Sequence, residues 1–97
     1  MRKVTKRIKK AFEQGTALKV DNTSTDGTSV FLYGNEIIRR ESSGLVVATL
    51  AGWNTSTTRE RINGITGLDI YQKNFVPMLS GQEIDAHDWV THTEEVI

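Results

Sequence analysis

The spacing of hydrophobic residues changes along the chain, from that of a helix near the N-terminus to that of strands further on. Four apolar residues recur at intervals of four, three and one and would form one stripe on a helix: Val4, Ile8, Ala11 and Phe12. Gly15 follows where a left-handed C-cap is expected. The pattern therefore predicts a helix over residues 3–14.

Residues 16–51 have the pattern of an antiparallel meander, with short β-branched and aromatic runs between turn residues. Four strands are predicted, at residues 16–20, 29–33, 36–41 and 45–51. Asn22–Gly27 is predicted to be a loop, and Gly34-Asn35 a two-residue hairpin turn. The run 45–51 is apolar nearly throughout, which predicts a central strand.

The second half of the chain begins with a predicted helix and continues with short strands. Thr57 and Glu60 have the spacing of a capping box, and Asn63-Gly64 would end that helix. Strands are predicted at residues 69–73 and 75–79 around a Lys73-Asn74 turn, the second of them an edge strand because it contains Pro77. Residues 85–91 are predicted to form either one helical turn or a tail anchored by Trp89.

These elements predict an α+β fold in which an N-terminal helix packs on a mostly antiparallel sheet of about five strands. A short helix is expected after the third or fourth strand. The length of 97 residues predicts one domain over residues 1–97, with a flexible acidic tail over about 85–97.

Composition and charge narrow the classes of function. The chain has no cysteine, which excludes disulfides and cysteine nucleophiles. It has no apolar run long enough to span a membrane and no apolar core of a signal peptide, and the absence of cysteine fits a cytoplasmic location. Residues 1–48 hold nine basic and five acidic residues, and residues 49–97 hold three and seven. Such a separation of charge can guide a binding partner.

The most distinctive segment is GWNTSTTRERIN at residues 52–63. Hydroxyl groups and arginines at the start of a helix can bind a phosphate or a carboxylate. The candidate binding residues here are Trp53, Thr57, Thr58, Arg59 and Arg61. The alternative, which base rates favour, is an ordinary capped helix in which Trp53 packs on Ile62 and both arginines point to solvent.

The basic helix is a second candidate surface. The first ten residues contain six Lys or Arg and no acidic residue. Lysines clustered on one helix are typical of contacts with nucleic-acid phosphates, and the candidate residues are Lys6, Lys9 and Lys10. A solvated face, or pairing with the acidic C-terminal end, is the alternative.

Metal binding and catalysis have little support in the sequence. Asp85, His87, Asp88 and His92 are close together, but the histidines are five residues apart, which does not place two ligands on one helix face. The GxSxG and HExxH motifs are absent. No catalytic residue, metal or cofactor is therefore predicted.

The segments TDGTSVFLYGNEIIRR and GWNTSTTRERIN resemble a family of small proteins of tailed bacteriophages or prophages that has no established function. Its pattern is a basic helix, a Gly-Asn hairpin and the motif GWxTxTTRxR(I/L)N. The likeness covers about residues 2–79 and omits the acidic end. It implies a phage origin but no activity.

The resulting hypothesis is a non-enzymatic phage-type interaction protein that binds a host or phage protein, as an inhibitor or modulator. The alternative is a nucleic-acid-binding module that uses the basic helix with Arg59 and Arg61. No membrane interaction is predicted.

Overall fold

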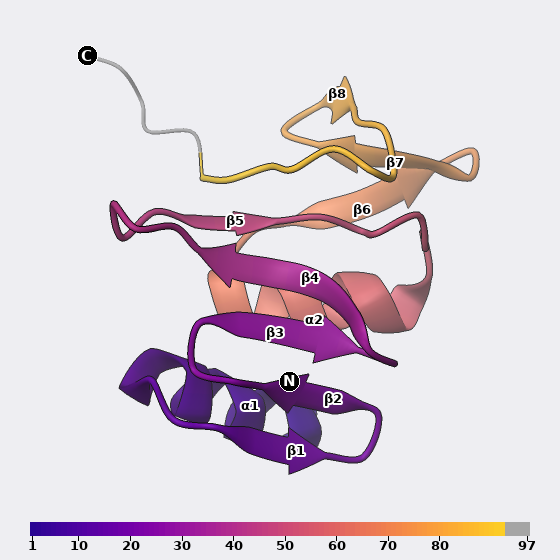
Figure 1. The fold of residues 1–97 in the computed structure, drawn as a ribbon. Helices are drawn as coiled ribbons and strands as arrows, with labels where there is room; N and C mark the ends of the chain where they lie inside the picture. The colour runs from indigo at the N-terminus through magenta and orange to yellow at the C-terminus, as the bar shows by residue number, and fades with distance from the viewer. Residues whose placement is uncertain (93–97) are drawn as a thin grey trace.

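The computed structural model describes residues 1–92 as two antiparallel sheets and two helices (Figure 1). Strands β1–β5 form one sheet in sequence order, and β6–β8 form the second. Both helices lie behind the larger sheet in the view of Figure 1. The elements are α1 Lys3–Gln14, β1 Leu18–Val20, β2 Thr23–Thr25, β3 Ser29–Leu32, β4 Asn35–Arg40, β5 Val46–Ala48, α2 Ser56–Thr66, β6 Ile70–Lys73, β7 Val76–Leu79 and β8 Gln82–Glu83.

The α+β class and the N-terminal helix on a five-stranded antiparallel sheet are confirmed. Helix α1 has the predicted bounds, and its apolar stripe places Ile8 and Phe12 in the core. Gly15 ends the helix in the left-handed conformation, with φ of 72°. Within residues 1–92 neither helix is long and apolar enough to cross a membrane.

The prediction of a loop over Asn22–Gly27 was wrong, because β2 occupies its centre. Thr23 and Thr25 are buried there, opposite Leu32 and Val30 of β3. Threonine is β-branched and suits a strand, and the Thr25 hydroxyl donates to the Ser29 carbonyl at 2.6 Å. This extra strand is the reason that α2 follows the fifth strand instead of the third or fourth.

Strand β5 is not central, as its apolar run predicted, but lies at the end of the five-strand order. Its outer edge is covered by a strap that we define as residues 84–92. Ala48 and Val90 exchange backbone hydrogen bonds of 2.8 and 2.7 Å, and the Thr91 hydroxyl donates to the Val46 carbonyl at 2.6 Å. The apolar composition of β5 therefore reflects burial under this strap as well as on the sheet.

The strap contains the first part of the segment that was predicted to be a C-terminal tail. It has no helical turn over residues 85–91. Trp89 does anchor it, because its ring lies 4.3 Å from the guanidinium carbon of Arg39. The remainder of the predicted tail, residues 93–97, lies outside the described residues.

Helix α2 begins and ends at different residues from those predicted. Its N-cap is Thr55, whose hydroxyl accepts a hydrogen bond from the Thr58 N–H at 3.1 Å, and not Thr57. It passes through Asn63-Gly64 and stops at Gly67. Gly64 is a packing residue, because a Cβ there would lie 2.6 Å from the Thr5 methyl group of α1. The absence of a side chain allows the two helices to approach closely.

Pro77 does not mark an edge strand, because β7 is the central strand of the second sheet. Its carbonyl faces β8 and accepts a hydrogen bond from the Ile84 N–H. The proline nitrogen faces the same way, beyond the two residues of β8 that pair with Met78 and Leu79. The proline therefore removes only the bond that an N–H would donate toward Ile84, just past the end of β8.

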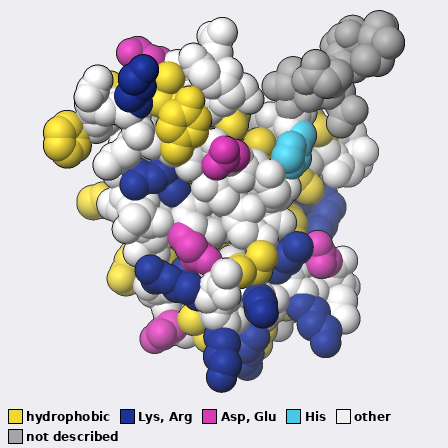
Figure 2. Space-filling view, turned by 180° about the vertical axis from the view of Figure 1, so that it is seen from behind, with side chains coloured by type: hydrophobic (Ala, Val, Ile, Leu, Met, Phe, Trp, Pro, Cys, Tyr) yellow, Lys and Arg dark blue, Asp and Glu magenta, His cyan; other side chains and the backbone are white. Residues whose placement is uncertain are grey.

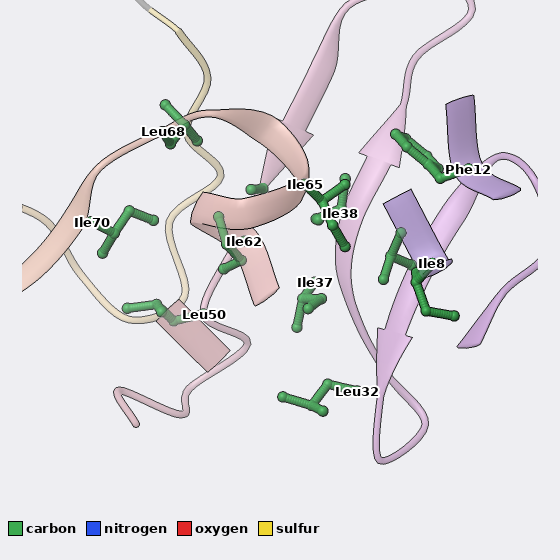
Figure 3. Packing of buried hydrophobic residues seen from close by; sticks show 12 residues of the cluster. Ile8, Phe12, Leu32, Ile37, Ile38, Leu50, Ile62, Ile65, Leu68 and Ile70 are labelled. Atoms are coloured by element: carbon green, nitrogen blue, oxygen red, sulfur yellow. The ribbon is translucent and has the colours of Figure 1, made fainter. Parts of the chain in front are cut away.

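The core lies between the two helices and the sheets (Figure 3). Ile62 and Ile65 of α2 contribute to it, together with Ile37 and Ile38 of β4. Val30 of β3 pairs with Ile38 and Phe31 pairs with Glu36, so Ile37 is the extra residue of a β-bulge in β4. Because of this bulge, both Ile37 and Ile38 are buried. The same cluster includes Leu50, Leu68 and Ile70, which join the second sheet to the first.

Candidate binding surface

A groove of about 430 Å³ lies between the β3–β4 turn and the start of α2. It takes in part of the segment Gly52–Asn63 that the sequence singled out. No charged side chain lines it. The lining residues are Leu32, Tyr33, Asn35, Ile37, Leu50, Trp53, Thr55, Thr57 and Thr58.

Tyr33 stands at one rim of this groove and is 74% exposed. The hairpin turn is Tyr33-Gly34, one residue earlier than predicted, with φ of 51° and 81°. Two positive φ values are those of a type I′ turn, in which Asn-Gly is preferred. A tyrosine in this conformation costs about 1–2 kcal/mol relative to a residue that favours it.

Trp53 also lines the groove and is 58% exposed. It follows a tight turn in which Ala51 and Gly52 have φ of 54° and 86° and the Trp53 N–H donates to the Leu50 carbonyl. Ile62 is completely buried, whereas Trp53 is largely exposed and is not a core anchor. Trp53 is therefore a surface residue whose backbone position is set by the preceding turn.

Phe75 is the most exposed large hydrophobic residue of the described chain, at 87%. It belongs to the β6–β7 turn, which is Asn74-Phe75 and not Lys73-Asn74, with φ of 52° and 65°. The Asn54 side-chain amide donates to the Phe75 carbonyl at 3.3 Å. This bond holds the β6–β7 turn beside the loop that carries Trp53.

We call Tyr33, Trp53 and Phe75 the aromatic edge. The three turns that carry them lie along the right-hand side of the molecule in Figure 1. Hydrophobic side chains protrude along the corresponding left-hand edge in Figure 2, which shows the opposite face. Exposed aromatic residues on three separate turns thus lie along one side of the fold.

Arg59 lies beside this edge. One terminal nitrogen of its guanidinium donates to the Asn54 side chain and, at 3.5 Å, to that of Gln72. Neither its Nε nor its second terminal nitrogen has a hydrogen-bond partner within residues 1–92, and the side chain is half-buried. Its position is fixed while part of its donor capacity faces solvent.

Arg61 does not belong to the same surface, and its predicted role in binding an external anion is wrong. It is only 3% exposed, because a spacing of two residues on a helix separates the side chains by more than half a turn and places Arg61 against α1 and β2. Its guanidinium donates to Thr23 at 2.9 Å, Thr5 at 3.3 Å and the Glu60 carboxylate. These internal partners occupy the groups that would bind a phosphate.

Glu60 balances the charge of Arg61 within this buried cluster. Partial burial raises the pKa of Glu60, but hydrogen bonds from the Thr5 hydroxyl and from Arg61 lower it by more. The backbone N–H of Arg2 and the charge of Arg61 act in the same direction, so the pKa lies below 4.5. The carboxylate is therefore held in its charged form.

The two threonines predicted as binding residues differ in their accessibility. Thr58 is 1% exposed, and its hydroxyl lies 2.9 Å from that of Thr55. It is chiefly part of the helix cap. Thr57 is half-buried and lines the groove beside Trp53.

The basic residues of α1 form a separate surface. Lys6 and Lys10 are exposed and Lys9 is half-buried, and no ion pair involves them within residues 1–92. Figure 2 shows lysine and arginine side chains gathered at the lower end of the molecule, where α1 lies. The polar cluster around Arg61 does not extend this surface, because Glu60 neutralises it.

The histidines and aspartates of the strap do not converge. His87 lies 3.5 Å from Asp85, whereas the His92 ring nitrogen lies 2.7 Å from the Thr66 carbonyl at the end of α2. Across residues 1–92, no three side chains of the ligand types are grouped for a metal ion.

Tyr33 and Phe75 were predicted to lie on strands, whereas the structure places both in turns. The signal available was the dipeptide Tyr33-Gly34 ahead of a polar residue and Asn74-Phe75 after a lysine. In each case one residue that favours a positive φ is paired with an aromatic residue that does not.

A model of the family described as Kyanoviridae Gp96 protein matches residues 1–95 of the chain. The match extends beyond the resemblance noted from the sequence and includes most of the acidic end. Neither the curated proteins nor the solved structures gave a match.

Proposed function

Because the chain belongs to the Kyanoviridae Gp96 family of phage proteins, we propose that it is a non-enzymatic interaction protein that binds a host or phage protein inside the host cell through the aromatic edge. The observation that carries this proposal is the exposure of Tyr33, Trp53 and Phe75, at 74%, 58% and 87%, on three adjoining turns. Tryptophan and tyrosine are the residues most enriched among those that dominate protein interfaces.

The conformation of the turns supports the same proposal. Tyr33 and Phe75 have positive φ angles, which cost stability and are found most often where function requires them. Neither ring recovers that cost by burial in the core. Binding to another protein would bury both rings and the Trp53 indole.

The test is purification of tagged protein from phage-infected cells, with two variants of matched size. The edge variant combines Tyr33→Ser, Trp53→Ala and Phe75→Ser, and the helix variant combines Lys6→Gln, Lys9→Gln and Lys10→Gln. We expect a protein to copurify in a fixed molar ratio with the wild type and the helix variant, and to be lost from the edge variant.

Equal recovery of that protein with the edge variant would overturn the proposal, and so would recovery of nucleic acid alone. Thermal unfolding of both variants provides the control for folding. A second readout is whether excess edge variant fails to compete with the wild type for the copurified protein.

Binding of nucleic acid is the second candidate, and the exposed basic face of α1 favours it. This candidate now rests on the lysines and not on Arg61, which is buried. It predicts a gel shift of DNA or RNA at low salt that weakens steeply as salt rises and is lost in the helix variant. Absence of a shift at low salt would exclude it.

A further inference from the structure

We infer that the aromatic edge recognises a short segment of its partner in which an apolar side chain lies next to an aspartate or glutamate. This inference rests on the proposed function and specifies the chemistry of the partner. The apolar side chain enters the groove between Tyr33 and Trp53, and the carboxylate binds Arg59.

The groove has the size and lining for an apolar side chain. Its volume of about 430 Å³ is within the range of pockets that bury a small ligand, roughly 300–1,000 Å³. Leu32, Ile37 and Leu50 line it, and its polar side-chain groups are hydroxyls, one amide and the indole N–H of Trp53. A charged group placed inside would lose its hydration without gaining an ionic partner.

Thr55 and Thr58 do not compete for that space as hydrogen-bonding groups. Their hydroxyls are 2.9 Å apart, and that of Thr55 also accepts from the Thr58 N–H. The hydroxyls that cap α2 are thus already engaged, which leaves the groove suited to an apolar guest. Tyr33 and Trp53 also line the groove and are largely exposed, so their rings would cover the bound side chain.

Charge determines the second half of the motif. The three turns, residues 33–35, 52–57 and 74–75, contain no charged residue, and Arg59 is attached to two of them through Asn54. The two unpaired guanidinium nitrogens of Arg59 suit the two oxygens of one carboxylate. An acidic segment complements this single positive charge, whereas a basic segment would be repelled.

The arrangement of Arg59 adds to its suitability. Asn54 and Gln72 hold one terminal nitrogen in place, so less side-chain freedom is lost when the remaining donors bind. Asn54 also donates to Gln72 and to the Phe75 carbonyl, each at 3.3 Å. The cation, the groove and the third aromatic ring are therefore held together by the same amide.

The experiment is selection of a displayed library of random heptapeptides on immobilised full-length protein. The edge variant serves for counter-selection. We expect the enriched peptides to contain Asp or Glu within three positions of Leu, Ile, Met or Phe. Absence of enrichment, or enrichment without acidic residues, would overturn the inference.

Titration of one selected peptide into variants then tests the contact with Arg59. We expect Arg59→Gln to weaken binding about tenfold, the loss of one charge-assisted contact, and Arg59→Lys to weaken it less. Lys10→Gln removes the same charge from α1 and should change affinity less than twofold. An unchanged affinity with folded Arg59→Gln would contradict the inference.

The two proposals can fail separately. If the edge variant loses the copurified protein while Arg59→Gln retains it fully, the proposed function stands and the acidic–apolar motif is wrong. If neither variant loses it, the aromatic edge is not the binding surface.

Discussion

Arg59 and Arg61 are two residues apart on α2 but belong to different regions, one a buried polar junction and the other an exposed aromatic edge. Arg61 is 3% exposed and lies in a polar junction formed with Thr5, Thr23 and Glu60. Arg59 lies beside three exposed aromatic rings, and part of its guanidinium faces solvent. The first region buries a charged group whose donors are paired, whereas the second exposes aromatic side chains that no element within residues 1–92 covers.

The polar junction stabilises the fold, whereas the aromatic edge reduces its stability. Throughout residues 1–92 every buried side-chain nitrogen and oxygen has a hydrogen-bond partner, as expected for a junction that holds α1 on α2 and β2. At the aromatic edge, Tyr33 and Phe75 have positive φ angles, and their rings remain outside the core. A stabilising role explains the first region but not the second.

The largest effect on stability is expected from Arg61→Gln. The change leaves the Glu60 carboxylate without its cation and Thr23 without its donor, so we expect a loss of about 3 kcal/mol in the free energy of unfolding, as for other broken buried pairs. Arg59→Gln should cost less than about 1 kcal/mol, since its partners are two neutral amides, one half-buried and one exposed. Urea denaturation of both variants measures the contrast, and equal losses would show that the two arginines do not differ in this way.

A smaller effect is expected from Glu60→Gln, at about 2 kcal/mol near neutral pH, because the amide can still accept from Thr5 but no longer pairs with the charge of Arg61. Since folding lowers the pKa of Glu60, its stabilising contribution is complete above pH 4.5 and is lost as the pH falls below that value. Asp26, whose pKa is lowered by hydrogen bonds from the Ser29 and Thr28 backbone N–H groups, acts in the same pH range.

The measurement is the unfolding free energy of wild type and Glu60→Gln between pH 3 and pH 7. The difference between the two proteins should shrink as the pH falls below 4.5, while the contribution of Asp26 remains in both. A difference that stays constant over the whole range would show that Glu60 contributes through packing and not through its charge.

Much of the fold could be predicted because it depends on local patterns. Helix α1 has its predicted bounds, and β3, β4, β6 and β7 begin and end within one residue of the prediction, whereas β5 ends three residues earlier. The sequence could not reveal that Thr23 and Thr25 form a strand, because their burial depends on α1 and on Arg61, which is distant in the sequence. It also could not place β5 at the edge of the order, since the covering strap comes from residues 84–92.

The candidate site was predicted only in part, for a related reason. Trp53 and Thr57 line the groove and Arg59 lies beside it, as their common segment suggested. Arg61 was indistinguishable from Arg59 by composition, and only the packing of α2 separates the two. Tyr33 and Phe75 enter the site through turns 42 residues apart in the chain, which no local pattern relates.

The smallest effect, and the one that tests the aromatic edge most directly, is expected from Tyr33→Asn and Phe75→Gly. Each substitution creates an Asn-Gly pair in a turn whose two central φ angles are positive, so each should stabilise the protein by about 1 kcal/mol. Thermal unfolding measures the gain, and Tyr33→Phe, which keeps the strain and loses only the exposed bond from Asn22, should show none. If the turns retain aromatic residues for binding, the two more stable variants should recover less of the copurified protein than the wild type and Tyr33→Phe. A gain in stability with full recovery would mean that the strain at these turns has no connection with binding, and the contrast between the two sides of α2 would then be one of packing alone.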